Sequence, residues 1–135
     1  MKLKLYIVPT NHVQQYWHLA KEYLDKALEK GEGEFTNDQL KLMVTQGNQQ
    51  LLLSMDKDKC LNAATVQWIS YPNERIAYVT YAGGTRLAEV VDEFKGWVKS
   101  SGGTAIQCST SHKGLVRLFQ KLNYKKKYTL MELKL

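Results

Sequence analysis

Two periods of apolar residues predict the first elements of the chain. Residues 2–8 alternate leucine and isoleucine with polar side chains, which is the period of a half-buried strand that Pro9 ends. From residue 12 to about residue 30, apolar side chains recur every three or four positions, so we expect an amphipathic helix there. Thr10 or Asn11 is its expected N-cap, because such side chains accept bonds from free amides of a first helical turn.

Turn and capping residues divide the next part of the chain into short elements. Thr36 begins a capping signal, a short helix covers residues 38–46, and Gly47 closes it. Short apolar runs then predict strands at residues 49–55, at 63–70 and from Arg75 onward. Because only short turns separate these strands, we expect an antiparallel meander.

The stretch from Arg75 to Tyr124 reads as strand, helix, strand, helix. The first strand runs into Gly83-Gly84, and helical spacing then continues from Leu87 to Val98, with Thr85 as the expected N-cap. A strand at residues 104–110, a helix to Tyr124 and a closing strand at residues 127–135 follow. A helix that starts beside a strand end suits an anion, because unpaired amides and the helix dipole point at it. A tight turn without any ligand explains the diglycine equally well.

The resulting order is β-α-α-β-β-β-α-β-α-β. It predicts an α/β (α+β) fold with a mixed, mostly antiparallel central sheet, and its length predicts a single domain over residues 1–135. Hydrophobic residues make up 44% and charged residues 24%, as in ordinary globular proteins. The sequence shows neither a membrane-length apolar run nor a signal-peptide pattern, so we expect a cytoplasmic protein.

The charge and the cysteine content of the chain limit which classes of partner and metal site we expect. The formal net charge is +6, and the last third of the chain is strongly basic. This suits an anionic partner, either cofactor phosphates or nucleic acid, although exposed lysines are usually only solvated. We do not expect nucleic-acid binding, because no groove-reading motif accompanies the charge. Cys60 and Cys108 lack metal-type spacing, so we read them as reduced buried thiols and predict no metal site.

The element order and several motifs resemble the GNAT superfamily of acyl-CoA-dependent N-acetyltransferases over nearly the whole chain. The sequence looks closest to the small GNAT-like proteins of tailed bacteriophages. The segments that carry the resemblance are QQLLLSM, AATVQWISYPNERIAYVTYAGG, WVKSSGG and TAIQCSTSHKGLVRLFQKLNY. The ending GLVRLFQKLNY is similar to the helix that precedes the terminal strands of that family.

The resemblance implies a site for acetyl-CoA or another acyl-CoA. In the family, two parallel strands separate and the pantetheine arm pairs with the free backbone between them, as in strand addition by a peptide. The residues implied to line the arm are Tyr78, Val79, Thr80, Tyr81 and Ala82. The diphosphate is implied to bind the amides of Gly83, Gly84, Thr85, Arg86 and Leu87, with added charge from Arg86.

Two positions depart from the family pattern. Arg86 stands where the phosphate loop of the family has a small residue, and Phe119 stands where it often has a tyrosine that protonates the leaving thiolate. A phenylalanine has no proton to give, so Tyr81, His112 and Tyr124 are the substitutes we name, with Ser109 and Ser111 nearby. The expected function is therefore acyl transfer to an unidentified amine. The alternative is a non-catalytic phage accessory or virion protein that acts by protein binding.

Overall fold

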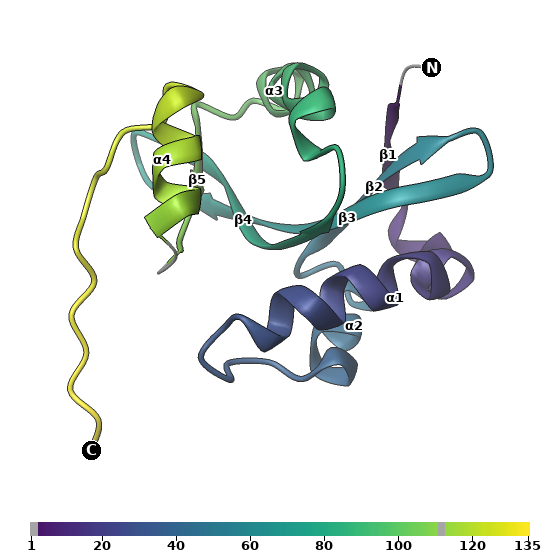
Figure 1. The fold of residues 1–135 in the computed structure, drawn as a ribbon, viewed down its shortest axis with the longest axis horizontal. Helices are drawn as coiled ribbons and strands as arrows, with labels where there is room; N and C mark the ends of the chain where they lie inside the picture. Colours follow the sequence, from purple (N-terminus) through teal and green to yellow (C-terminus); the bar gives the residue numbers. More distant parts are fainter. Residues whose placement is uncertain (1–2, 111–112) are drawn as a thin grey trace.

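The computed structural model describes residues 3–110 and 113–135 and contains a five-stranded sheet in the order β1-β2-β3-β4-β5 (Figure 1). Neighbouring strands are antiparallel except β4 and β5, which are parallel. This confirms the predicted mixed, mostly antiparallel sheet. The strands are β1 Lys4–Val8, β2 Gln50–Asp56, β3 Lys59–Ser70, β4 Arg75–Gly84 and β5 Ala105–Cys108. The helices are α1 Val13–Glu29, α2 Asn37–Thr45, α3 Val91–Ser100 and α4 Lys113–Lys121, with short 3-10 turns η1 Thr10–His12 and η2 Leu87–Val90.

Helices cover the sheet on both faces. In Figure 1, α1 and α2 lie below the sheet, and α3 and α4 lie above it. The lower core joins α1 and α2 to β2 and β3 through Trp17, Leu24, Leu40, Leu51 and Leu53. The upper core is smaller and is formed by Leu52, Val66, Ala77 and Val98, with Trp68, Phe94 and Trp97 packed against it. The alternation of β2 side chains between the two cores follows from the period of a strand.

Of the expected N-caps on the first two helices, one is correct and one is wrong. Thr36 forms a complete capping box with Gln39, in which each side chain bonds the backbone amide of the other residue. Neither Thr10 nor Asn11 caps α1, because both lie inside η1. The carbonyl of Pro9 accepts from the amide of His12 at 2.9 Å, so backbone rather than a side chain satisfies this turn.

The expected helix directly after the diglycine is also wrong at its start. Thr85 does not cap it, because Arg86 stands before η2 and both the amide and the hydroxyl of Thr85 donate to the carbonyl of Leu61 on β3, at 2.9 and 3.4 Å. Arg86 then takes a left-handed conformation with φ of 60°, which breaks the helical path. The four residues of η2 follow, and α3 begins only at Val91.

The predicted closing strand at residues 127–135 does not form. Residues 125–135 have no regular secondary structure and run away from the sheet in Figure 1. None of the five strands pairs with this segment among the described residues. β5 is shorter than expected, ending at Cys108 rather than at residue 110.

The diglycine is required by packing. A Cβ at Gly83 would overlap the carbonyl oxygen of Tyr23 on α1, so the absence of a side chain lets α1 lie against β4. Gly84 has a φ of 114°, which L-residues rarely adopt, and a Cβ there would lie 2.5 Å from the carbonyl oxygen of Leu61.

We expect Gly83→Ala to destabilise the protein by about 1–3 kcal/mol, because the backbone of α1 must move away from β4. Gly96→Ala is the matched control. Gly96 lies within α3, and a Cβ there meets nothing within 4 Å, so this change is expected to stabilise by roughly 0.5–1 kcal/mol. Urea unfolding followed by circular dichroism measures both changes. Equal stability of Gly83→Ala and the wild type would contradict the packing role.

Candidate functional site

β4 and β5 separate partway along the sheet. Their parallel pairing runs from Ile76 with Ala105 to Val79 with Cys108 and then stops. β4 continues for five further residues, Thr80–Gly84, of which Tyr81–Gly84 pair with β3 on one side. On the other side these residues have no strand partner within the described chain. A strand edge in this state can pair with an extended guest through its main chain.

A β-bulge marks the place where the strands separate. Thr65 pairs with Tyr81 and Val66 pairs with Val79, so Thr80 is the extra residue on β4. Val79 packs in the upper core and Tyr81 packs against the lower one. The bulge therefore turns the side chains of Thr80 and Tyr81 to the same side of the sheet.

Buried polar side chains hold the bulge. The Thr80 hydroxyl donates to Gln49 Oε1 at 2.5 Å and lies 2.6 Å from the Thr65 hydroxyl. Gln49 and Thr65 are both buried. Buried groups of this kind are costly unless paired, so the cluster fixes one arrangement of the bulge. The Gln49 Nε2 atom has no hydrogen-bond partner among the described residues.

The side chain of Tyr81, on β4, packs against the loop that joins α1 to α2. Its ring meets Phe35 edge-on, with centroids 6.2 Å apart. Burial, with smaller contributions from Glu34 and Tyr78, raises the pKa of Tyr81 above 10.0. A Cβ placed on Gly31 would lie 3.3 Å from Glu34 Oε1 and 3.6 Å from Tyr81 Cε1, so the carboxylate and the ring are close. At neutral pH the Tyr81 hydroxyl therefore keeps its proton and can donate it.

Tyr78 connects the two strands where they begin to separate. Its hydroxyl lies 2.6 Å from the hydroxyl of Ser109, the first residue after β5. Tyr78, Val79, Thr80 and Tyr81 are half-buried, and Ala82 is exposed. The predicted arm-lining residues are thus brought together along one strand, directly beside the end of β5.

The predicted diphosphate segment is already engaged in other contacts. Gly83 and Gly84 pair with β3, and the Thr85 amide donates to Leu61. The guanidinium of Arg86 forms an ion pair with Glu89, and a second bond joins Nη2 to Glu89 Oε1 at 2.7 Å. The hydrogen bond from Arg86 holds the pKa of Glu89 below its usual value.

Tyr124, the other named catalytic residue that the structure describes, lies away from Tyr81. Tyr124 packs on Phe119, with ring centroids 5.4 Å apart, and α4 lies on the face of the sheet opposite α1. Burial first, and then the nearby Cys108, raises the pKa of Tyr124. His112 and Ser111 lie outside the described residues.

Sequence reasoning did not identify Gln49, Thr65 and Glu34 as site residues. Two polar residues that belong to otherwise apolar strand segments are a usable signal for the first pair, since buried polar groups need partners. Glu34 carries no such signal, because it lies in a glycine-rich loop whose path the sequence does not fix.

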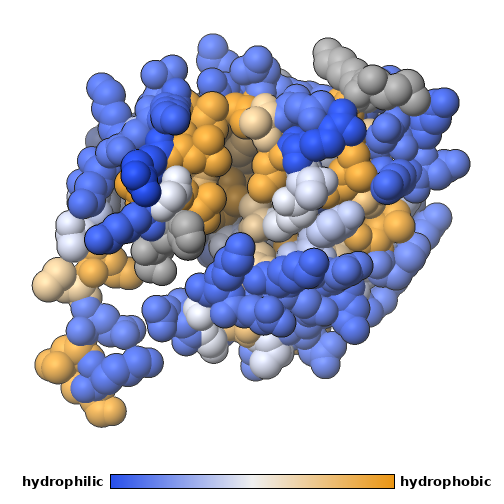
Figure 2. Space-filling view, viewed as in Figure 1, coloured by the Kyte–Doolittle hydropathy of each residue, from blue (hydrophilic) through white to orange (hydrophobic). Residues whose placement is uncertain are grey.

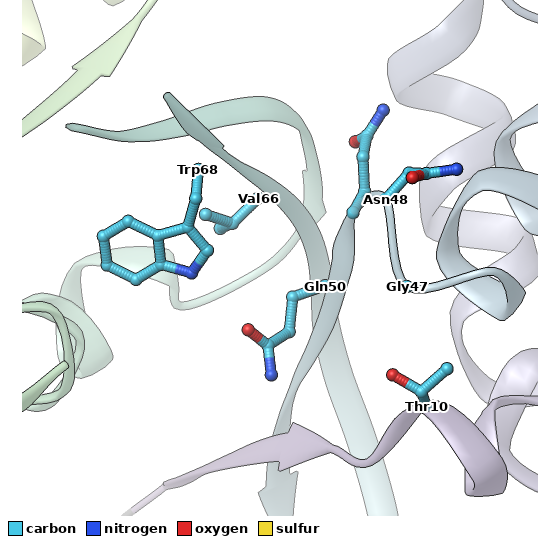
Figure 3. Close-up of a pocket in the computed structure, with 7 residues that line it drawn as sticks. Thr10, Gly47, Asn48, Gln50, Val66 and Trp68 are labelled. Atoms are coloured by element: carbon cyan, nitrogen blue, oxygen red, sulfur yellow. The ribbon is translucent and has the colours of Figure 1, made fainter. Parts of the chain in front are cut away.

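A separate pocket of about 340 Å³ lies near the beginning of β2 (Figure 3). Figure 3 shows Gln50 and Thr10 pointing toward a common space, with the ring of Trp68 across from them. Its lining contains none of the predicted site residues; it consists of Thr10, Gly47, Asn48, Gln49, Gln50, Val66 and Trp68.

The described residues offer neither a metal-binding cluster nor a membrane-spanning helix. They contain no group of three or more His, Cys, Asp or Glu side chains that could hold a metal ion. None of their helices combines the length and apolarity needed to cross a membrane.

Comparison with known proteins identifies the fold. Neither a family model nor a curated protein matches the sequence. Solved structures do match. An aminoglycoside acetyltransferase from an uncultured soil metagenomic sample, in complex with sisomicin, aligns with a TM-score of 0.72 at 11% identity, over 98% of this chain and 96% of its own. A possible acetyltransferase from Clostridium difficile 630 aligns with a TM-score of 0.68 at 11% identity, over 100% of this chain and 99% of its own.

A third structure, aminoglycoside N-acetyltransferase AAC(6')-Iy in complex with CoA, aligns with a TM-score of 0.67 at 10% identity, over 98% of this chain and 93% of its own. The chain has the GNAT fold. The expected resemblance is confirmed at the level of the fold, because sequence identities this low show the fold alone.

The raised pKa of Tyr81 has a measurable consequence for this GNAT-fold chain. Because the fold favours the neutral hydroxyl, its contribution to stability is present below pH 10 and is lost as the pH rises through the folded-state pKa. We expect the free energy of unfolding to fall more steeply above pH 10 in the wild type than in Tyr81→Phe. Urea unfolding at pH 8 and pH 10.5 measures the difference. Tyr71→Phe, at an exposed tyrosine, is the control. Identical slopes for the wild type and Tyr81→Phe would contradict the shift.

Proposed function

We propose that this protein is an acyl-CoA-dependent N-acetyltransferase that transfers an acyl group from acetyl-CoA, or another acyl-CoA, to an amine. The observation that carries the proposal is the edge of β4 from Thr80 to Gly84, which has no strand partner among the described residues beyond the point where the parallel strand β5 ends. The GNAT fold supports it, as does the neighbour in complex with CoA. The proposal places the protein in the cytoplasm, where acyl-CoA is available.

In this proposal the pantetheine arm lies along β4. Its amides pair with the free edge of Thr80–Gly84, beside the side chains of Tyr78–Ala82. The diphosphate lies at the segment Gly83–Leu87. The Thr85 amide contributes there only if its bond to Leu61 opens, so the amides at the start of η2 are the better donors.

The reaction joins the amine nitrogen to the thioester carbonyl carbon and breaks the carbon–sulfur bond. Glu34 accepts the proton that the amine loses, and the Tyr81 hydroxyl donates a proton to the leaving thiolate. Both groups are carried by elements on the α1 side, where the bulge at Thr80 turns the β4 side chains. Tyr124 and His112 stay predictions for the proton donor. Part of the rate comes from holding amine and thioester together.

The acceptor is an amine on a small molecule or a protein. Two of the structural neighbours are named as aminoglycoside acetyltransferases, which supports a small polyamine as the first class to test. Positively charged amines would approach a site whose nearest carboxylate is Glu34, and the opposite charge favours the encounter.

The cofactor prediction concerns binding and its dependence on the Arg86–Glu89 pair. We expect isothermal titration to detect CoA and acetyl-CoA, and pantetheine to compete with them. Glu89→Gln should tighten CoA binding by roughly two- to fivefold, because it removes a negative charge and releases Arg86 toward the diphosphate. Asp92→Asn, at an exposed carboxylate in the first turn of α3, is the matched control. No heat and no thermal shift at millimolar CoA would remove the proposal.

The catalytic prediction separates proton transfer from binding. Tyr81→Phe and Glu34→Gln should each lower kcat by about 10²-fold or more while leaving KM for acetyl-CoA nearly unchanged. Release of CoA, measured with a thiol reagent in the presence of a polyamine, reports the rate. Full activity in Tyr81→Phe would exclude this residue as the donor and leave Tyr124 and His112 to be tested.

A second candidate function keeps the fold without catalysis, as a phage accessory or virion protein that acts by protein binding. Two observations favour it. Arg86 is paired with Glu89, and Phe119 lies where a hydroxyl is expected. Under this alternative we expect the purified protein to be folded and not to bind CoA. We also expect to find it in purified phage particles.

A further inference from the structure

The pocket at the start of β2 forms where β1 stops covering its neighbour. The pairing of β1 with β2 ends at Val8 and Leu51, and Pro9 has no amide with which to continue it. Gln50 therefore has no partner on β1, although it still pairs with Val66 on β3. The upper face of the sheet is left open at this point.

The turn between α2 and β2 closes the pocket on its other side. A Cβ placed on Gly47 would lie 3.8 Å from Thr10 Oγ1, so this turn and η1 lie against each other. The enclosed volume is about 340 Å³. Ligand pockets usually measure about 300–1,000 Å³, so a molecule that fills this one is small.

Three polar side chains face the pocket without a partner of their own. Figure 3 shows the ring nitrogen of Trp68 turned toward Gln50, and Thr10 pointing into the same space. Among the described residues, no hydrogen bond satisfies the indole N–H of Trp68, the amide of Gln50 or the hydroxyl of Thr10. Trp68 and Gln50 are half-buried, so water or a ligand within the pocket has to satisfy them.

The ring of Trp68 is held in place before any ligand arrives. The guanidinium of Arg75 lies 4.0 Å from the ring centroid, and the ring of Trp97 lies 5.6 Å away. Arg75 is itself fixed, because its Nε donates to the carbonyl of Ser101 at 3.2 Å. The direction of the indole N–H is therefore set in advance, which lowers the cost of ordering on binding.

The lining selects the chemistry of the ligand. None of the lining residues is charged, so a charged ligand would leave water without an opposite charge to meet it. The indole N–H can only donate, whereas the amides of Gln50 and Asn48 and the hydroxyl of Thr10 both donate and accept. A ligand hydroxyl also does both, and Val66 offers an apolar surface to its carbon atoms.

We propose that this pocket binds a small neutral polyol of the size of a monosaccharide. One ligand hydroxyl accepts from the indole N–H of Trp68, and others bond the side chains of Gln50 and Thr10.

The pocket is separate from the proposed acyl-CoA site. Gln49 lines the pocket, but its side-chain oxygen is already bonded by Thr80. The hydrophobic side chains visible in Figure 2 gather between α3 and α4, and neither helix contributes to the pocket lining. The polyol site therefore does not depend on acyl transfer.

Nitrogen-15 NMR of the full chain, with glucose as the probe, tests the site. We expect the indole signal of Trp68 and the side-chain amide signal of Gln50 to shift and saturate, with a Kd on the order of 1 mM. The indole of Trp17, which donates to Asn37, should not move. A residue-specific signal is needed because polyols stabilise proteins in general by exclusion from their surface.

Matched variants locate the binding. Gln50→Leu keeps the length of the side chain but removes its amide, so Kd should rise by roughly fivefold or more. Thr10→Val, at an exposed side chain, should raise Kd by roughly threefold. Gln67→Leu is the control, because Gln67 is also half-buried but lies between Val66 and Trp68 on β3 and faces the opposite side of the sheet. Circular dichroism checks that each variant is folded.

Three outcomes would overturn the polyol site. The first is the absence of a saturable shift of the Trp68 signal at tens of millimolar glucose. The second is an unchanged Kd in both Gln50→Leu and Thr10→Val. The third is glucuronate binding as tightly as glucose, because the uncharged lining should reject a carboxylate. No acyl-CoA is present in these measurements, so the proposed function is tested separately.

Discussion

The incomplete pairing of β4 with β5 is the constraint on which the candidate site depends. If the two strands paired along their full length, Thr80–Gly84 would have no edge for a guest. The pairing stops at Val79 and Cys108, where β5 ends and directly before the bulge at Thr80 on β4. The bulge is held by the buried hydroxyl and amide contacts among Thr80, Thr65 and Gln49. A few polar atoms inside the sheet therefore decide where its edge becomes available.

Steric contact explains the diglycine before any ligand is considered. Gly83 admits the α1 backbone, and Gly84 supplies a φ that other residues avoid. The same two residues end β4 beside the place where a diphosphate is proposed to bind. A packing requirement and a ligand requirement can select the same residues, so their presence alone cannot distinguish a binding loop from a tight turn. The charges next to them carry more information.

Periodicity predicted most of the fold. The alternation in β1 and the helical spacing in α1 and α3 reflect burial on one face, which local sequence records directly. The capping signal at Thr36 could also be recognised in the sequence. The left-handed conformation of Arg86 and the bulge at Thr80 could not be predicted. Each depends on contacts with Leu61 or Thr65 of β3, which are distant in the sequence. The C-terminal residues 127–135 have the pattern of a strand, but a pattern cannot state whether a partner edge is present in the same chain.

The electrostatics around Arg86 bear most directly on the choice between an enzyme and a binding protein. Glu89 and, at longer range, Asp56 both stabilise the charged guanidinium. An incoming diphosphate must therefore compete with carboxylates for the same cation. The ion pair is exposed at the surface, and exposed pairs are weak and screened by salt, so a diphosphate with two negative charges and several oxygen acceptors is able to displace Glu89. In the proposed acyl-CoA site, the pair would therefore lower the affinity without closing the site. The GNAT fold and the unpaired edge of β4 therefore support the proposed acyl-CoA site more than the Arg86–Glu89 ion pair counts against it.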